Sequence, residues 1–352
     1  MVTLIVYDLP NRDCRAKASN GEICCHANDD GTCNYDMGGD CSAGIEDYKK
    51  NYIDVFAKHL KDYAGKVDVA LIIEPDSLPN LASNLSDPHC ANSQQAYKEG
   101  AKYAIDTLYE ANPDATMYLD AAHGGWLGWS DNMDQFTELI AGMDIASKLR
   151  GFATNVANYQ ALGQAMCPWD NHAQPTRNDY CLGGAHQGDL CCKDPCNLES
   201  QWNGANNELN YANMLSHDMR RAIPGFTPVM IIDTGRNGIT NEREDCANWC
   251  NIRNAGVGHR PTTNTEDSEL IDAYLWLKTP GESDGCTQML PSGKQCARFD
   301  SFCGSEDSLG SRGGEPRSPE AGQWFDYQIK QLAANAHLDG ISAVETMMSF
   351  TQ

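Results

Sequence analysis

Short apolar runs alternate along the chain with longer segments in which apolar residues recur every three or four positions. The short runs are typical of buried β-strands and the longer segments of helices that cover them. Predicted strands are 2–7, 69–73, 115–119, 151–154, 228–232 and 273–277; predicted helices are 48–63, 96–108, 133–149, 206–221 and 320–335. Near-continuous apolar strands separated by helices predict an α/β fold with a parallel sheet.

Such a sheet can close into a β/α barrel or remain open and doubly wound. Polar and aromatic residues follow the C-terminal end of nearly every predicted strand. Barrel active sites are built at that end of the strands. The pattern therefore favours the barrel.

Three cysteine-rich segments, 22–43, 162–203 and 281–317, interrupt this alternation. Loops of this length are uncommon in compact domains and are usually functional. We expect disulfide-stapled loops over a cleft, inserted into a single catalytic domain that spans residues 1–352.

The chain has 16 cysteines, an even number that points to an oxidising compartment. Metal ligation is the competing interpretation. The sequence has no paired C-x-x-C units, and none of its 9 histidines completes a zinc-finger spacing. Disulfides are therefore favoured, and we expect a secreted protein.

The formal net charge of −23 makes nucleic acid a poor partner, and no apolar run is long enough to span a membrane. A neutral substrate fits better. Met1 leads directly into a strand pattern without the features of a signal peptide. We therefore expect the chain to begin inside a longer one.

Candidate chemistry begins at the ends of the first two predicted strands. Asp13 follows the first strand, and Asp76 follows the second after Pro75. A surface ion pair of Arg12 with Asp13, and an Asp76 that caps a helix, are the structural alternatives. Two facing aspartates would instead raise one pKa and provide the protonated carboxyl that glycosidic bond cleavage needs.

The third strand leads into a glycine-rich stretch that holds His123, Trp126 and Trp129. Core packing is the usual role of tryptophan, but the glycines leave these rings little to pack against. Exposed indoles suit the apolar faces of pyranose rings. His123 can donate a hydrogen bond to a sugar hydroxyl, although a structural histidine is an alternative.

The segment 281–285 matches the G-x-S-x-G pattern of serine hydrolases. That motif needs a helix after the serine, and the residues that follow are not helical in pattern. We therefore do not expect Ser283 to be a nucleophile. The neighbouring charges of Lys278, Glu282 and Asp284 are more informative.

Seven segments together resemble, in order, motifs of glycoside hydrolase family 6, whose members are cellobiohydrolases and endoglucanases. They are YDLPNRDC…SNGE, IIEPDSLPNL, MYLDAAHGGWLGW, FATNVANY, IIDTGRNG, NWCN and KTPGESDG, and the resemblance extends from residue 2 to about residue 335. It implies a distorted, mostly parallel, TIM-like β/α barrel of the seven-stranded type. It also implies hydrolysis of β-1,4-glucan with inversion, without a metal or organic cofactor.

The resemblance implies five catalytic positions. Asp76 matches the general acid, and Asp13 matches the aspartate that raises the pKa of the acid and guides the water. Ser19 holds that water, and Tyr7 favours a distorted sugar ring. Asp284 matches a second carboxylate that is either the base or a charge stabiliser.

The substrate contacts implied by the resemblance lie on both sides of the scissile bond. The leaving side is expected to use Trp126, Trp129, Asn84, His123 and Asn158. The non-reducing side is expected to use Trp249, Lys278 and Glu282, with Arg236 and Lys278 as the positive groups around Asp284.

Two disulfides are implied by the same resemblance, Cys14–Cys90 and Cys250–Cys303. Four further cysteines lie in segment 22–43 and can pair among themselves. Segment 162–203 holds five, so at least one must reach Cys246, Cys286 or Cys296, or stay free.

The chain also departs from the family. The first barrel strand and one stacking tryptophan of the family are missing, and a C-terminal extension at 336–352 has no counterpart. Asn84 begins a glycosylation sequon, and we expect it to be unmodified because a glycan there would obstruct the cleft.

The leading hypothesis is a monomeric, secreted, inverting cellobiohydrolase that acts on cellulose and cello-oligosaccharides. Attachment to a carbohydrate-binding module in the full-length protein is left open. The long segment 281–317 favours exo action from the non-reducing end. An endoglucanase of the same family, a glucan-binding protein without turnover and a cysteine-rich metal-binding protein are the alternatives.

Overall fold

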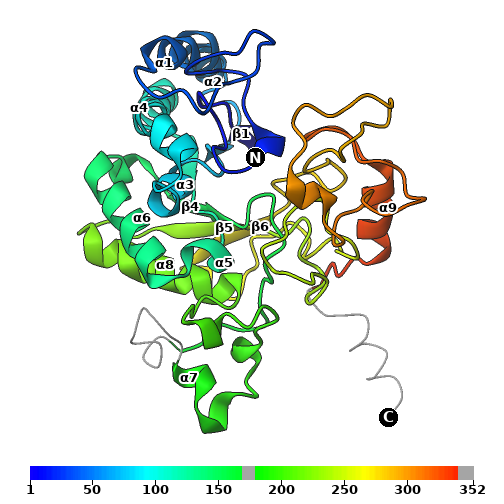
Figure 1. Ribbon diagram of the computed structural model, residues 1–352. Helices are drawn as coiled ribbons and strands as arrows, with labels where there is room; N and C mark the ends of the chain where they lie inside the picture. The colour runs from blue at the N-terminus through cyan, green and yellow to red at the C-terminus, as the bar shows by residue number, and fades with distance from the viewer. Residues whose placement is uncertain (169–178, 340–352) are drawn as a thin grey trace. The chain divides into compact units, whose positions relative to one another are not determined.

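A computed structural model describes residues 1–168 and 179–339 (Figure 1). Its core is one six-stranded sheet with the strands in sequential order. The strands are β1 (Val2–Val6), β2 (Val69–Ile73), β3 (Thr116–Asp120), β4 (Gly151–Thr154), β5 (Val229–Asp233) and β6 (Ile271–Leu275). All six predicted strands are therefore confirmed, with ends shifted by at most two residues.

The order of the strands distinguishes the two architectures left open by the sequence. A doubly wound sheet reverses direction at a switch point, whereas a β/α barrel adds each strand next to the previous one. Strands β1, β2, β3 and β4 pair in parallel, with Val2 opposite Val69 and Ala70 opposite Thr116. The fold is thus of the barrel type, and the described residues contribute six strands to it.

Contacts divide the chain into two compact units, which share the strands of this sheet. Unit 1 comprises Met1–Ala122, Asp131–Ala153 and Leu215–Met230. Unit 2 comprises His123–Ser130, Thr154–Met214 and Ile231–Gln352, of which residues 169–178 and 340–352 lie outside the described part. The described part of the expected C-terminal extension is therefore only 336–339.

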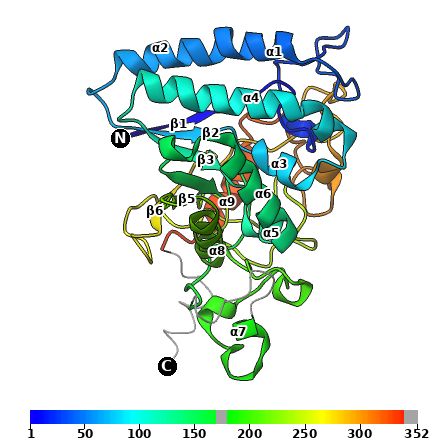
Figure 2. The same ribbon diagram turned by 90° about the vertical axis from the view of Figure 1, so that its left-hand side faces the viewer.

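In unit 1, a long helical stretch runs side by side with α4 (Figure 2). The stretch consists of α1 (Ser42–Asp47), a π-helical segment (Tyr48–Ile53) and α2 (Asp54–Asp62), and α4 is Pro88–Ala111. Asp87 caps α4 by accepting the backbone N–H of His89. Gly100 lets this helix approach the end of β1, because an added Cβ would lie 2.3 Å from Leu9 Cδ2.

The remaining helices are shorter. They are α3 (Leu78–Ser83), α5 (Gly124–Leu127), α6 (Ser130–Met143), α7 (Asp179–Leu182), α8 (Glu208–Ala222) and α9 (Asp326–Ala334). Single 3₁₀ turns occur at Lys17–Ser19, Ala146–Lys148, Gly184–His186, Leu190–Cys192, Glu199–Gln201 and Ser301–Gly304. Among helices in the described ranges, none combines the length and the apolar character that crossing a bilayer requires.

Four predicted helices differ from the structure by six or more residues at one end. The helical stretch predicted from residue 48 begins at Ser42, and the helix predicted from residue 96 begins at Pro88. The helix predicted at 133–149 stops at Met143, where Asp144 adopts a left-handed backbone with φ of 55°. The helix predicted at 320–335 begins only at Asp326, because the preceding residues are extended and pair with 281–283.

All sixteen cysteines are paired. The pairs are Cys14–Cys90, Cys24–Cys33, Cys25–Cys41, Cys167–Cys191, Cys181–Cys192, Cys196–Cys246, Cys250–Cys303 and Cys286–Cys296. Both pairs implied by the resemblance are confirmed. So is the expectation that segment 22–43 pairs internally and that one cysteine of segment 162–203 reaches outside it.

Candidate functional site

Asp76 lies at the tip of β2 on a constrained backbone. Glu74 and Asp76 both adopt left-handed conformations, with φ of 49° and 59°, which are costly for residues other than glycine. The Asp76 backbone N–H donates to Asp120 Oδ2 at 3.0 Å, and its carbonyl accepts Asn80 Nδ2 at 2.5 Å. Ser77, not Asp76, occupies the N-cap of α3, so the capping alternative is wrong.

Asp13 is held in the loop that follows β1. It is 4% exposed and has φ of 54°, so it is not a member of a surface ion pair. The Ser19 hydroxyl donates to Asp13 Oδ2, and the Ala16 backbone N–H donates to Oδ1 at 3.3 Å. The loop itself is anchored to α4, because the Tyr97 hydroxyl donates to the Asn11 carbonyl at 2.6 Å.

Arg12 ties this loop back to the end of β1. Its Nη1 donates to the Tyr7 carbonyl at 2.7 Å and to Asp8 Oδ1 at 3.1 Å, and its Nε donates to the Ser19 carbonyl at 3.1 Å. The guanidinium lies 4.2 Å from the centre of the Tyr7 ring. Arg12 therefore fixes the relative positions of Tyr7 and Ser19.

Several of the predicted catalytic residues of unit 1 interact with Tyr7. Burial raises the pKa of Tyr7 well above its usual value, and the nearby carboxyl groups of Asp13 and Asp76 raise it further. A hydrogen bond with Ser19 opposes this rise. The structure thus brings together Tyr7, Asp13, Ser19 and Asp76, the four predicted catalytic residues of this unit.

A third aspartate in this cluster was missed by sequence reasoning. Asp120 ends β3 and is 1% exposed. Burial raises its pKa to about 7, against the hydrogen bonds from the Ala122 and Asp76 backbones, and the charge of Asp13 adds to the rise. Its Oδ1 is buried without a hydrogen-bond partner among the described residues. Its position at a strand end was the available signal.

Glu74, also missed, connects the ends of β1 and β2. Its carboxylate accepts the Tyr48 hydroxyl at 2.6 Å and the backbone N–H groups of Asp8 and Leu9 at 3.2 and 3.3 Å. Burial raises the pKa of Glu74 to about 7 despite these donors. It is a structural carboxylate that supports the strand ends carrying Tyr7 and Asp76.

In unit 2, Asp284 is paired with a buried cation. Arg236 Nη1 donates to Asp284 Oδ1 at 2.6 Å, and both side chains are almost completely buried. The Tyr159 hydroxyl and the Asn251 backbone N–H each donate to Asp284 Oδ2 at 2.8 Å. Burial alone would lower the pKa of Arg236, but the charge of Asp284 holds it above its usual range. Tyr159 and Asn251 had not been predicted.

The other predicted residues of segment 278–284 lie beside this pair. Burial lowers the pKa of Lys278, which the charge of Asp284 opposes, and Lys278 Nζ donates to the Ser283 carbonyl at 3.3 Å. Glu282 is half-buried. The Ser283 hydroxyl is buried and donates to the Pro319 carbonyl at 2.9 Å, and no helix follows, so its exclusion as a nucleophile is supported.

The predicted stacking residues of unit 2 are partly accessible. Trp126, in α5, and Trp129 are half-buried, unlike core tryptophans. The His123 ring meets Trp126 edge-on with the ring centres 6.3 Å apart. Burial, followed by the charge of Arg243, lowers the pKa of His123 to about 3, so the imidazole is neutral.

Three further predicted sugar contacts lie in different surroundings. Asn158 Oδ1 accepts the Tyr159 backbone N–H at 2.8 Å, and the half-buried Trp249 lies against Phe302 with the ring centres 5.8 Å apart. Asn84 belongs to unit 1, whereas Asn158 and His123 belong to unit 2, so their shared sugar stays a prediction. Asn84 Nδ2 donates to Asn80 Oδ1 at 3.0 Å, a bond that favours an unmodified side chain.

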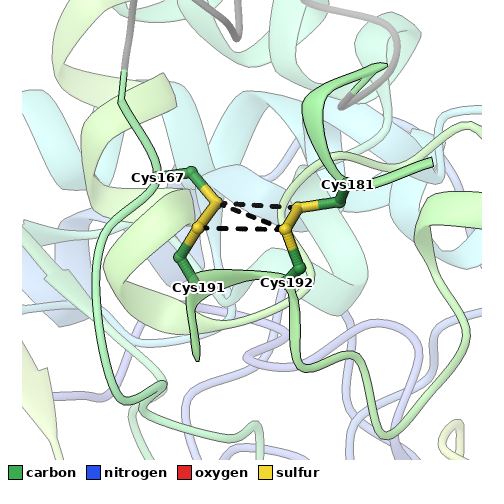
Figure 3. A group of neighbouring side chains, drawn as sticks. All are labelled: Cys167, Cys181, Cys191 and Cys192. Atoms are coloured by element: carbon green, nitrogen blue, oxygen red, sulfur yellow. Dashed lines mark hydrogen bonds between the residues drawn. A yellow bond between two sulfur atoms is a disulfide. The ribbon is translucent and has the colours of Figure 1, made fainter. Parts of the chain in front are cut away.

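Four cysteines of segment 162–203 form the arrangement most like a metal site in the described part (Figure 3). The sulfurs of Cys167, Cys181, Cys191 and Cys192 all lie within 4.8 Å of one another. They are joined as two disulfides, and Cys167 Sγ lies 3.6 Å from Cys181 Sγ of the other pair. Bonded sulfurs are not thiolate ligands, so a metal would require both bonds to be reduced.

Comparison with known proteins gives a consistent result. Residues 1–181 and 191–336 match the family described as "Glycosyl hydrolases family 6". Exoglucanase 3 of Agaricus bisporus is 40% identical over 96% of this chain and 64% of its own length. A 1,4-beta-D-glucan cellobiohydrolase C of Emericella nidulans is 40% identical over 95% of this chain and 61% of its own length. The chain therefore spans about three fifths of the length of these relatives.

Solved structures agree with these relatives. Cellobiohydrolase II (Cel6A) of Humicola insolens, in complex with glucose and cellotetraose, superposes with a TM-score of 0.73 at 34% identity, covering 95% of this chain and 77% of that one. CcCel6C of Coprinopsis cinerea superposes with a TM-score of 0.72 at 34% identity, covering 97% and 78%.

Proposed function

The chain belongs to glycosyl hydrolase family 6, and from this premise we propose that it hydrolyses β-1,4-glucosidic bonds in cellulose and cello-oligosaccharides with inversion. The names of its relatives, exoglucanase and cellobiohydrolase, support exo action that releases cellobiose from the non-reducing end. The bound cellotetraose of the Humicola insolens structure supports the substrate class.

One observation carries the proposal more than any other: the carboxyl groups of Asp13 and Asp76 both lie close enough to Tyr7 to raise its pKa, and Ser19 donates to Asp13. Cleavage of a glycosidic bond needs a proton on the leaving oxygen and a water on the opposite face of the sugar. Asp76 supplies the proton, and the charge of Asp13 favours its protonated form.

The water is the second reactant. Ser19 holds it, and Asp13, hydrogen-bonded to Ser19, guides it toward the anomeric carbon. An inverting enzyme keeps its two carboxyl groups roughly 6.5–9.5 Å apart to leave room for this water. Tyr7 crowds the sugar at the cleavage point and favours a ring shape closer to the transition state.

Asp284 acts in this proposal as a fixed negative charge. Its pairing with Arg236 and its bond from Tyr159 occupy the carboxylate, which suits charge stabilisation better than proton abstraction. We therefore assign the guidance of water to Asp13.

Substrate binding is divided among aromatic and polar groups. On the leaving side, Trp126 and Trp129 stack on sugar rings, and Asn84, His123 and Asn158 hold their hydroxyls. On the non-reducing side, Trp249 stacks, and Lys278 and Glu282 bind the terminal glucose. A neutral His123 can both donate and accept a hydrogen bond, as hydroxyl recognition requires.

The setting of the enzyme is part of the proposal. Eight disulfides suit a secreted protein. We propose a monomer that acts outside the cell without a metal or organic cofactor, with disulfide-stapled loops that enclose the substrate. Attachment to a carbohydrate-binding module is compatible with the greater length of the relatives.

The product's stereochemistry tests family and mechanism together. Proton NMR during hydrolysis of cellotetraose should show newly formed reducing ends appearing first as the α-anomer. The β-anomer as first product would contradict inversion. In carboxymethylcellulose, viscosity should fall slowly relative to sugar release; a rapid early fall would replace exo with endo action, and binding without any release would leave a glucan-binding protein.

A further inference from the structure

Trp324 is an exposed tryptophan to which the proposed mechanism gives no role. It directly precedes the buried Phe325 at the start of α9, and its side chain is 57% exposed. In the described ranges 1–168 and 179–339, its indole N–H makes no hydrogen bond. A solvent-exposed indole is a surface on which a sugar ring can stack.

The backbone beneath Trp324 is well fixed. Residues 281–283 and 323–325 form a short antiparallel ladder, with the Ser283 N–H donating to the Gln323 carbonyl at 2.8 Å and the Phe325 N–H to the Gly281 carbonyl at 2.7 Å. Phe325 is 4% exposed and anchors the end of the ladder in the core. A platform built this way loses little conformational freedom when a ligand binds.

The register of this ladder places Trp324 next to a predicted sugar contact. Glu282 and Trp324 form an antiparallel bridge pair. Residues directly opposite each other in such a pair project from the same face, with Cβ atoms about 4.5–5.5 Å apart. Glu282 and Trp324 are therefore direct neighbours across the ladder.

Gly281 determines how the indole lies. Its φ is +104°, and an added Cβ would lie 2.7 Å from Trp324 Cζ3 and 2.8 Å from Cη2. The ring thus rests against the Gly281 backbone, which only a residue without a side chain permits. With that contact made, the exposure of the indole leaves its remaining surface available to a ligand.

The geometry points to one glucose-binding unit in which Glu282 binds the hydroxyls of a glucosyl residue and Trp324 covers the apolar face of the same residue. This inference rests on the proposed function, which makes Glu282 a contact of the terminal glucose on the non-reducing side. The chemistry of the two groups is complementary, because carboxylate oxygens accept from hydroxyls and an indole face attracts C–H groups.

The test compares initial rates on cellotetraose for the wild type, Trp324→Ala and Trp324→Phe. Loss of the indole should raise KM about tenfold while kcat stays within about twofold, since an aromatic contact of this kind is worth on the order of a tenfold change in affinity. Trp324→Phe should recover part of the loss. Tyr63→Ala is the matched control, because Tyr63 is also 57% exposed but is the C-cap of α2 in unit 1.

A double substitution tests whether Trp324 and Glu282 bind the same glucosyl residue. Trp324→Ala combined with Glu282→Gln should raise KM by clearly less than the product of the two single effects, as expected for coupled contacts. Effects that multiply, or a KM for Trp324→Ala within twofold of wild type, would overturn the inference. If Trp324→Ala does not fold, Trp324→Leu provides the same test.

Failure of the inference and failure of the proposed function give different results. A wild type that hydrolyses cellotetraose and is insensitive to Trp324 substitution retains the function and loses the inference. A wild type that neither cleaves nor binds cellotetraose removes both.

Discussion

The site aspartates of unit 1 and the buried Asp284 of unit 2 differ in the charged groups that surround them. In unit 1, the carboxyl groups of Asp13 and Asp76 lie near Tyr7, and Asp120 lies near Asp13 and accepts the Asp76 backbone N–H. Arg12, beside the Tyr7 ring, contacts Asp8 and backbone carbonyls. In unit 2, Asp284 contacts Arg236 directly and accepts two further hydrogen bonds. The first arrangement brings carboxyl groups close to one another, which favours the protonated form, and the second pairs a carboxylate with a cation.

This difference supports different proposed roles for the two sets of carboxyl groups. A group that must deliver a proton needs surroundings in which its neutral form is competitive. A group that must stabilise positive charge at the reacting carbon needs to stay ionised. The two environments therefore support Asp76 as the acid and Asp284 as a fixed charge.

Removing the acid should give the largest effect. Asp76→Asn keeps the size of the side chain but cannot donate the proton, so kcat on cellotetraose should fall by about 10³-fold, within the usual range for general acid catalysis. Binding of cellotetraose, measured by titration calorimetry, should change by less than about threefold because no contact to the sugar hydroxyls is lost.

The control for this prediction is the same substitution at the other end of the same strand. Asp68 is exposed and directly precedes β2, so Asp68→Asn should leave kcat unchanged. If Asp76→Asn retains more than a tenth of the wild-type rate, the assignment of the acid is wrong.

Breaking the buried pair should give the next largest effect, on stability. Arg236→Met leaves Asp284 buried without its cation, and such losses typically cost about 3–5 kcal/mol of the free energy of unfolding. Urea denaturation measures this loss. The double variant Arg236→Met with Asp284→Asn should recover part of it, because no unpaired charge remains.

An exposed pair provides the comparison for this experiment. Lys330 and Asp326 lie 2.5 Å apart on α9 with side chains 72% and 66% exposed. Lys330→Met should change the free energy of unfolding by no more than about 0.5 kcal/mol. Equal decreases in the free energy of unfolding for Arg236→Met and Lys330→Met would show that the buried pair contributes no more to stability than the exposed pair.

Asp120 predicts a dependence of stability on pH. Its pKa rises from 3.8 to about 7 on folding, so the folded protein binds the proton more tightly than the unfolded chain. Its contribution is complete below about pH 4 and is lost as pH rises through about 7. Asp120→Asn should remove this decline, on the order of 3 kcal/mol.

The measurement is the difference in free energy of unfolding between wild type and variant at pH 4.5 and pH 7.5. Taking this difference cancels other titrating groups such as Glu74. Asp114→Asn, in the exposed turn before β3, should show the same pH dependence as wild type. A pH-independent difference for Asp120→Asn would contradict the proposed protonation of Asp120.

The sequence could predict the site residues that follow a local pattern, but not those whose role depends on distant contacts. Strands and their polar ends are local patterns, and these led to Asp13, Asp76 and Asp284. Asp120 has the same local pattern, but its role depends on the backbone of Asp76, 44 residues away. Glu74 depends on Tyr48 and on the β1 end in the same way.

The same reasoning applies to the boundaries that were wrong. The helix predicted from residue 320 begins later because 323–325 pairs with 281–283, a partner that periodicity cannot reveal. Disulfide connectivity is likewise a property of distant contacts, as the Cys196–Cys246 bond between two loops illustrates. Local patterns indicate which groups exist, whereas long-range contacts decide what surrounds them.

The smallest predicted effect concerns Tyr159, which links the two members of the buried pair. Its hydroxyl donates to Asp284 at 2.8 Å and accepts from Arg236 Nη1 at 2.9 Å. Tyr159→Phe keeps the ring beneath the guanidinium but removes these two bonds and a third, from the Ile252 backbone N–H at 3.2 Å. The free energy of unfolding should therefore fall by about 2 kcal/mol. Tyr103→Phe is the matched control, since its hydroxyl donates to Asp54 at 2.6 Å in an exposed setting and should cost about 0.5 kcal/mol or less. A loss for Tyr159→Phe no greater than for Tyr103→Phe would mean that Arg236 alone keeps Asp284 in place, and the hydroxyl would then have no part in fixing the anion.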